Sequence, residues 1–169
     1  MPPSTLPDLL IRPFAAPDIA PANVLTNHYI QHTAIHFATQ PATDAEFGDS
    51  WLQARDRFPW FAATVDDRFA GYAKAGTWRS RAAYDQTAEV GLYVHPDFQR
   101  RGIGRALYAA LFDDARRRGF HTLVAGIALP NDTSVKLHEA CGFTHAGTFR
   151  EVGRKFDQWH DAGFWQRML

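Results

Sequence analysis

The sequence has one cysteine and no long apolar run. Cys141 has no partner for a disulfide within the chain, which favours a reducing compartment. No stretch approaches the roughly 20 apolar residues that a membrane-spanning helix needs, and the first residues lack the basic and apolar regions of a secretory signal. We therefore expect a cytoplasmic protein that does not act at a membrane.

The chain also has no excess of charge of either sign. Eighteen basic residues balance eighteen acidic ones, so no basic surface field favours binding to nucleic acid. The 169 residues are enough for one domain with a proper core and too few for two ordinary domains. We expect one domain over residues 9–169, a flexible proline-containing tail over residues 1–8, and a small-molecule partner.

Apolar periodicity and turn signals predict a mixed α/β domain, with about seven strands in a central sheet and about four helices around it. The expected strands lie at 9–12, 61–65, 69–76, 87–94, 123–127, 144–149 and 159–168. The expected helices lie at 18–32, 43–57, 104–118 and 131–140. The second helix has the clearest start, because Thr43 and Glu46 have the spacing of a capping box.

A glycine-containing loop joins the predicted strand 87–94 to the predicted helix 104–118. It reads Gln99-Arg100-Arg101-Gly102-Ile103-Gly104. The glycines let a ligand approach the backbone, and the free N–H groups and positive dipole end of the next helix face the same point. This geometry favours a diphosphate, whereas a turn that merely needs glycine is the alternative. The sequence lacks the lysine-containing P-loop motif and the third glycine of the dinucleotide fingerprint.

This loop resembles the pyrophosphate loop of the GNAT superfamily, whose members are acetyl-coenzyme A-dependent N-acetyltransferases. Other stretches are similar to the phosphinothricin N-acetyltransferase group of that superfamily. These stretches are 29–41, 78–85, 129–143, 153–161 and 164–167. The resemblance implies a GNAT fold and a cytoplasmic homodimer. It also implies transfer of an acetyl group from acetyl-CoA to the amino group of a small amino-acid acceptor, such as phosphinothricin, methionine sulfoximine or methionine sulfone.

The resemblance further implies which residues hold acetyl-CoA. They are Leu92, Tyr93, Val94, Arg100, Arg101, Gly102, Ile103, Gly104, Arg105 and Asn131. Asn131 could also be the N-cap of the predicted helix 131–140, and the two roles are compatible. No metal is expected, because His28 and His32 have a spacing that could hold one but lack a third ligand.

Acetyl transfer to an amine needs a proton acceptor, a polarised thioester carbonyl and a proton for the departing thiolate. We expect Glu89 to be the general base, because a carboxylate in an apolar strand is partly desolvated; a solvent-exposed glutamate is the alternative. A backbone amide near Tyr93 or Val94 would polarise the carbonyl. His138 would protonate the thiolate or, alternatively, pack against the sheet.

The loop after residue 76 carries the expected acceptor-binding side chains. Arg79, Arg81 and Tyr84 would hold the carboxylate and the phosphinate or sulfone group, because a guanidinium matches paired oxygens. A solvated basic loop is the alternative. Phe37 would form a wall of the same pocket or belong to the core. We expect Cys141 to be a packing residue rather than a nucleophile.

Two other functions remain open at this point. The same fold could acetylate a protein N-terminus or a polyamine, although the neutral surface and the arginine-bearing loop argue against a polyamine. The chain could also be a non-catalytic sensor of acyl-coenzyme A. The presence of Glu89 argues against the sensor.

Overall fold

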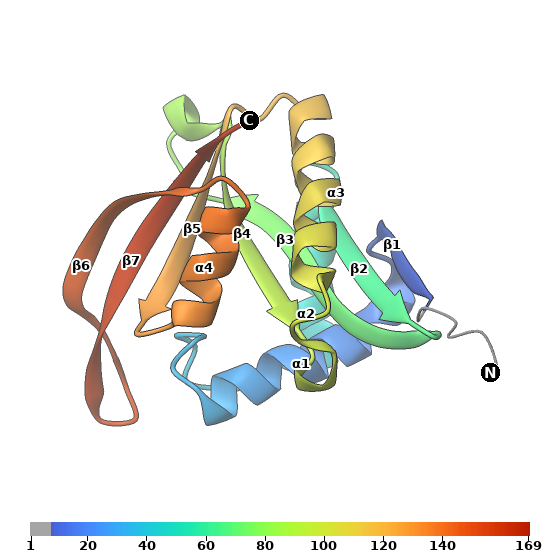
Figure 1. The fold of residues 1–169 in the computed structure, drawn as a ribbon, viewed down its shortest axis with the longest axis horizontal. Helices are drawn as coiled ribbons and strands as arrows, with labels where there is room; N and C mark the ends of the chain where they lie inside the picture. The colour runs from blue at the N-terminus through green and yellow to red at the C-terminus, as the bar shows by residue number, and fades with distance from the viewer. Residues whose placement is uncertain (1–7) are drawn as a thin grey trace, which may run out of the picture.

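A computed structural model describes residues 8–169, so the tail expected over residues 1–8 lies, except for Asp8, outside the described residues. One seven-stranded sheet has the strand order β1-β2-β3-β4-β5-β7-β6 (Figure 1). The strands are β1 (Leu9–Pro13), β2 (Trp60–Val65), β3 (Arg68–Thr77), β4 (Thr87–Val94), β5 (Thr122–Leu129), β6 (Thr144–Lys155) and β7 (Gln158–Met168). The α-helices of residues 8–169 are α1 (Ile19–His32), α2 (Asp44–Ala54), α3 (Ile103–Arg117) and α4 (Asp132–Ala140). The mixed α/β architecture expected from the sequence is confirmed.

The helices form two layers on opposite faces of the sheet (Figure 1). On one face, α3 buries Leu107 and Leu111 completely, as expected for the apolar side of an amphipathic helix. On the other face, α1 and α2 cover an aromatic cluster in which the rings of Trp60 and Tyr72 stack 6.1 Å apart. The hydroxyl of Tyr72 lies 2.6 Å from that of Thr26 on α1. None of the helices has the length and hydropathy of a membrane span in residues 8–169.

The central pair of strands separates partway along its length. Strands β4 and β5 are parallel and pair only over 87–89 and 122–124, although each strand has eight residues. Strand β4 stays paired with β3 as far as Val94. Past Glu89, the edge of β4 that faces β5 therefore has backbone N–H and C=O groups that form no hydrogen bonds to a neighbouring strand.

Two expected boundaries are wrong. Helix α2 ends at Ala54 rather than near residue 57, because residues 55–57 form a turn in which the Arg57 amide donates to the Ala54 carbonyl at 3.1 Å, three residues back instead of the four of an α-helix. Strand β6 continues to Lys155 rather than stopping at 149. Residues 150–152 form a bulge, and a bulge interrupts the alternation by which a strand is recognised.

The bulge in β6 is held from the neighbouring strand. The carboxylate of Asp161 on β7 accepts a hydrogen bond from the Glu151 amide at 2.8 Å, and Glu151 has a φ of +49°. Pairing then resumes between Gly153 and His160. Strand β6 forms an edge of the sheet.

The capping box at the start of α2 is confirmed. The Thr43 hydroxyl accepts a hydrogen bond from the Glu46 amide at 3.2 Å, and the Glu46 carboxylate accepts one from the Thr43 amide at 2.8 Å. These bonds satisfy two backbone donors that a helix start leaves free, an effect of about 1 kcal/mol.

Candidate active site

The loop between β4 and α3 presents backbone donors to a cavity. Gly102 is the N-cap of α3 and has a φ of +80°, a conformation that glycine adopts without strain. Because α3 begins at Ile103, its first amide groups have no partner within the helix. A Cβ added at Gly104 would lie 3.0 Å from Leu137 and 3.1 Å from Leu92. Glycine at this position therefore keeps the floor of the loop close to β4 and α4.

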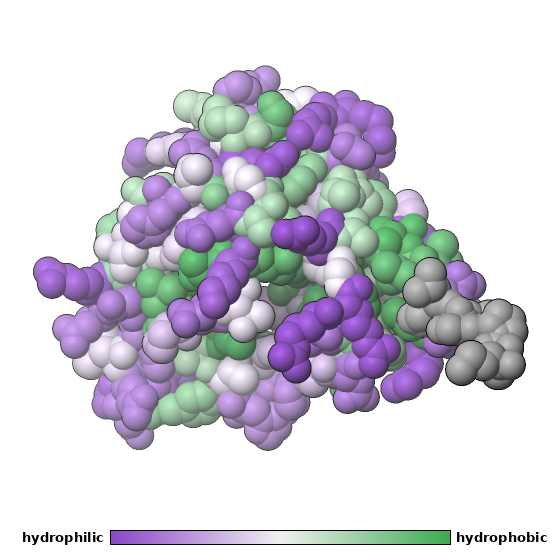
Figure 2. Space-filling view, viewed as in Figure 1, coloured by the Kyte–Doolittle hydropathy of each residue, from purple (hydrophilic) through white to green (hydrophobic). Residues whose placement is uncertain are grey.

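The cavity beside this loop has a volume of about 470 Å³. Its lining includes nearly all the residues expected to hold acetyl-CoA, namely Leu92, Tyr93, Val94, Arg100, Gly102, Ile103, Gly104, Arg105 and Asn131. Arg101 is the exception, because its guanidinium lies over the ring of Phe98, 5.5 Å from the ring centroid. Figure 2 shows the hollow between the N-terminal ends of α3 and α4, bordered by hydrophilic residues. The sequence-predicted set is thus brought together around one cavity.

The free edge of β4 points backbone N–H groups into the same space. The amide of His95 donates to the Ala70 carbonyl on the β3 side at 2.8 Å. Because donors alternate between the two edges of a strand, the amides of Leu92 and Val94 point toward β5 instead. The carbonyl of Val94 on that edge accepts a hydrogen bond from the Tyr29 hydroxyl at 2.8 Å. Of the two expected carbonyl-polarising amides, that of Val94 faces the cleft.

Asn131 closes the other side of the cavity. Its side-chain oxygen accepts a hydrogen bond from the Ser134 amide at 3.2 Å, so it is the N-cap of α4. It also lines the cavity. The N-cap role expected from the sequence is confirmed, and the residue remains in position to contact a ligand.

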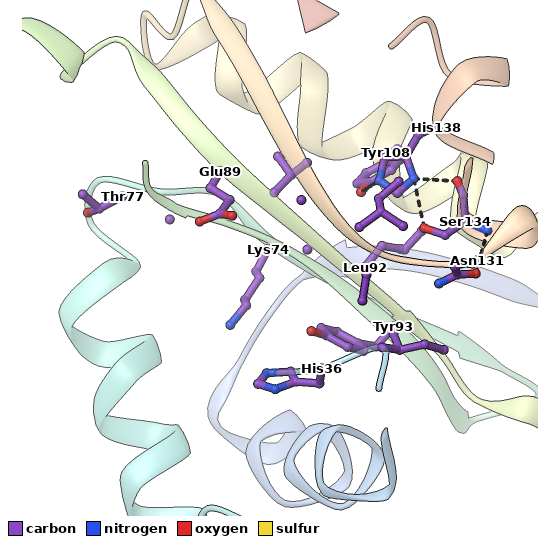
Figure 3. Close-up of a pocket in the computed structure, with 17 residues that line it drawn as sticks. His36, Lys74, Thr77, Glu89, Leu92, Tyr93, Tyr108, Asn131, Ser134 and His138 are labelled. Carbon is purple, nitrogen blue, oxygen red and sulfur yellow. Dashed lines mark hydrogen bonds between the residues drawn. The ribbon is translucent and has the colours of Figure 1, made fainter. Parts of the chain in front are cut away.

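A second cavity, of about 410 Å³, continues through the gap between β4 and β5. The two cavities share Ile35, Leu92, Tyr93, Asn131, Ser134 and His138. Side chains alternate along β4, so Leu92 faces α3 while Glu89 and Tyr93 face the α1 layer. Figure 3 shows His138 and Ser134 on one side of the strand and Lys74 and His36 on the other. The glycine loop and Glu89 therefore open into one continuous space.

Glu89 is the acidic residue that lines the second cavity. Burial raises its pKa above the ordinary value, while the charges of Lys74 and Arg79 act in the opposite direction. Its side chain is nevertheless exposed to the solvent of the cavity that it lines, so the solvent-exposed alternative describes its accessibility while the surrounding protein still desolvates the carboxylate in part. A carboxylate with a raised pKa is a better proton acceptor than a solvated one.

His138 is buried and its two ring nitrogens are both engaged. Nδ1 lies 2.7 Å from the carbonyl of Ser134, which only accepts, so Nδ1 carries the hydrogen. Nε2, at 2.7 Å from the Tyr108 hydroxyl, is then the acceptor. Burial lowers the pKa of His138. The packing interpretation of this residue is supported, whereas the general-acid role stays a prediction.

Comparison with known proteins fits this geometry. The profile of the acetyltransferase (GNAT) family matches residues 27–143. The chain belongs to the GNAT family. It is 46% identical over 157 residues to a phosphinothricin N-acetyltransferase of Streptomyces viridochromogenes, covering 93% of this chain and 86% of that protein.

Two further similarities come from Salmonella typhimurium. An L-methionine sulfoximine/L-methionine sulfone acetyltransferase is 37% identical over 154 residues, which cover 90% of each chain. An acetyltransferase solved with its cofactor acetyl-CoA has a TM-score of 0.92 at 34% identity, covering 95% of this chain and 94% of that one. The GNAT fold and the enzyme class expected from the sequence, an N-acetyltransferase, are confirmed.

Of the three acceptor-binding residues expected in the arginine-bearing loop, only Arg79 lies near Glu89. Arg79 lies over the ring of Trp78 and is close enough to influence the pKa of Glu89. Arg81 is the N-cap of a short 3-10 helix, Ala82–Tyr84, whose last residue is Tyr84, and neither residue lines the cavities described above. The acceptor-binding role of all three residues stays a prediction.

Phe37 belongs to the wall of a third, smaller cavity that adjoins Glu89 and has a volume of about 240 Å³. Its ring packs against the backbone of Gly153 in β6, where a Cβ would approach it within 2.4 Å. Its ring centroid lies 6.2 Å from that of His160. The position is compatible with the expected acceptor-binding role, which stays a prediction.

Sequence reasoning missed three residues of the GNAT site. Tyr108 lies within the predicted helix 104–118 and was not singled out, although a buried tyrosine hydroxyl needs a hydrogen-bond partner. Lys74 interrupts an apolar strand just as Glu89 does, and that interruption was the available signal. His36 lies in the loop between α1 and α2, and no local sequence pattern predicts where that loop lies in the fold.

Cys141 and the histidine pair on α1 are the remaining residues that the sequence analysis singled out. Cys141 is half-buried, and burial raises the pKa of its thiol, which argues against a nucleophilic role. His28 and His32 have ring centroids 5.2 Å apart. Within residues 8–169, no three His, Cys, Asp or Glu side chains are grouped as metal ligands would be.

Proposed function

We propose that this chain transfers the acetyl group of acetyl-CoA to the amino nitrogen of a small amino acid of the phosphinothricin, methionine sulfoximine or methionine sulfone type. The observation that carries the proposal is the continuous space from the glycine loop, through the gap between β4 and β5, to the carboxylate of Glu89. The names of the relatives from Streptomyces and Salmonella supply the acceptor class.

The residues around the first cavity fit acetyl-CoA. The free amides at the start of α3 and the positive end of its dipole suit linked phosphates, and Arg100 and Arg105 add positive charge at the rim. Acetyl-CoA supplies the acetyl group as a thioester. The amides of Leu92 and Val94 would donate hydrogen bonds to groups bound along the free edge of β4, including the thioester carbonyl.

Glu89 would act as the general base. An amino acid arrives with an ammonium group, so a proton must leave the nitrogen before or during attack. The raised pKa of Glu89 improves its ability to accept that proton. Arg79, whose charge acts on Glu89, would bind the α-carboxylate, which is bonded to the same carbon as the amine.

In place of the general-acid role expected from the sequence, we propose that His138 positions Tyr108. A neutral imidazole with both nitrogens engaged has no free proton to give. Tyr108 is buried in the wall of the second cavity. The leaving thiol has an ordinary pKa of about 8.5, so its departure needs little assistance from an acid.

The test is an acceptor panel with acetyl-CoA in which release of free thiol is followed. The panel contains phosphinothricin, methionine sulfone, a short peptide with a free amino terminus, and a linear polyamine. We expect turnover with the two amino acids. Binding of acetyl-CoA, measured by calorimetry, without turnover of either amino acid would overturn the acceptor assignment and favour the sensor.

We also propose that the enzyme is a homodimer that uses the edge of the sheet at β6. Phe149, Val152, Phe156 and Trp159 are each more than half exposed on the β6–β7 hairpin. An exposed apolar edge of this kind is typical of an interface. Sedimentation equilibrium should give twice the mass of the chain, and a monomer at micromolar concentration would contradict the proposal.

A further inference from the structure

A cluster of hydrogen-bond donors lies in the second cavity, the one that Glu89 lines. None of these donors binds a group of the acceptor in the mechanism proposed above. Lys74 extends from β3 into this cavity, and its ammonium lies 5.1 Å from the ring centroid of Trp60. The residue opposite it on β4 is Gly91, where a Cβ would lie 3.6 Å from the Lys74 side chain. No ion pair within 4.0 Å joins Lys74 to an acidic residue of the described chain.

His36 contributes a second donor at the same end of the cavity. Its Nδ1 accepts a hydrogen bond from the Ala38 amide at 3.0 Å. Burial, together with the charges of Lys74 and Lys155, lowers the pKa of His36 to about 4. The imidazole is therefore neutral near pH 7, and its hydrogen is on Nε2, which is free to donate.

Tyr93 contributes the third donor. Its ring centroid lies 6.0 Å from that of His36, and no hydrogen bond to its hydroxyl is formed by residues 8–169. Figure 3 shows the Tyr93 hydroxyl and the Lys74 ammonium directed toward the same region, next to the ring of His36. One cation and two neutral donors thus converge with no acceptor between them.

Lys74 and Glu89 lie at diagonal positions of the β3–β4 ladder, each opposite a glycine. Gly76 is opposite Glu89 in the β3–β4 ladder, and Gly91 is opposite Lys74. Diagonal positions across an antiparallel pair are about 7–8 Å apart, and the charges of Lys74 and Glu89 act on each other's pKa across this distance. Gly126 on β5 clears further space beside Glu89, where a Cβ would lie 3.4 Å from its carboxylate. The cavity therefore has an acidic end and, a short distance away, an electropositive end.

We infer that Lys74, His36 and Tyr93 bind a second anionic group of the acceptor, located on its side chain, while the amine lies at Glu89. The inference rests on the proposed function. It makes this chain selective for amino acids with an acidic side-chain terminus, such as a phosphinate or a carboxylate, over those with a neutral terminus. Lys74 is then a specificity-determining residue.

The experiment compares an acidic and a neutral acceptor in one variant. For Lys74→Met we expect kcat/KM for phosphinothricin to fall at least tenfold, mainly through KM, while kcat/KM for methionine sulfone changes less than threefold. Lys136→Met, on the exposed surface of α4, is the matched control and should change neither value. Lys74→Arg keeps the charge and should recover a large part of the preference.

Each outcome bears on a different claim. An equal fall for both acceptors would mean that Lys74 serves the α-carboxylate or Glu89, and it would overturn the inference, as would no change for either. Thermal unfolding of each variant shows whether it is folded, and Lys74→Gln replaces the methionine variant if that one is not. An unmodified enzyme that acetylates neither amino acid contradicts the proposed function instead.

Discussion

The two halves of the active-site space are built in different ways. The half beside α3 and α4, the proposed cofactor half, consists mainly of backbone amides, glycines and a helix cap, drawn from the loop at 99–105 and from Asn131. The half beside α1, the proposed acceptor half, consists of single side chains from separate segments, among them His36, Lys74 and Glu89. Backbone groups suit a ligand part that every member of the GNAT family shares. Individual side chains can change without altering the fold, so they suit the part that determines which acceptor is used.

The largest expected effect tests the acceptor half at its acidic end. Glu89→Gln should lower kcat/KM by about 10²–10⁴-fold, the usual contribution of a general base, without changing acetyl-CoA affinity. Because burial raises the pKa of Glu89, the rate of the unmodified enzyme should fall with decreasing pH at values above the ordinary carboxyl range. Glu151→Gln on β6 is the control. Equal rates for Glu89→Gln and the unmodified enzyme would revive the sensor hypothesis.

The next effect tests how the acceptor half is attached to the rest of the fold. Lys155 is buried, and its ammonium donates to the carbonyls of Ile30 at 2.5 Å and His36 at 2.6 Å. Lys155→Met leaves both carbonyls without this donor and should lower the free energy of unfolding by about 2–3 kcal/mol. Urea unfolding measures this loss, with Lys136→Met as control. The KM for the acceptor should rise more than that for acetyl-CoA, and a proportionate rise in both would count against separate halves.

A smaller effect concerns pH and the acceptor half. His36 has a pKa of about 4 in the folded protein, against 6.5 for an ordinary histidine. As the pH falls from 7 to 4.5, the unfolded chain takes up a proton that the folded protein does not, so stability decreases. The His36 contribution to this decrease is about 2 kcal/mol. In His36→Asn, urea unfolding at the two pH values should show a decrease smaller by that amount, and an unchanged decrease would contradict the burial of a neutral imidazole.

The smallest effect tests the cofactor half. Gly104→Ala places a methyl group 3.0 Å from Leu137 and 3.1 Å from Leu92, so the loop and the β4 edge must move apart slightly. The KM for acetyl-CoA should rise about tenfold, which corresponds to about 1.4 kcal/mol, while the acceptor KM stays the same. Thermal unfolding controls for a general loss of stability, because alanine favours a helix over glycine. A change confined to the acceptor KM would break the division between the two halves.

The sequence by itself determined the order of the elements and most of the residues that gather in the proposed cofactor half. Helix caps such as Thr43 with Glu46, the strand alternation around Glu89, and the glycine loop depend on interactions between residues a few positions apart. Those interactions are the same wherever the segment lies in the fold. The chemistry of the loop at 99–105 could therefore be inferred before the sheet order was known.

Only the tertiary structure decided where β4 and β5 separate and which side chains meet in the acceptor half. The pairing of β4 with β5 stops after Glu89, and no residue pattern within either strand marks that point. His36 and Lys74 line the same cavity, because Lys155, far along the chain, donates a hydrogen bond to the His36 carbonyl and so holds the loop between α1 and α2. Such contacts depend on strand order, on the bulge in β6 and on loop placement, all of which arise from packing over long separations in sequence.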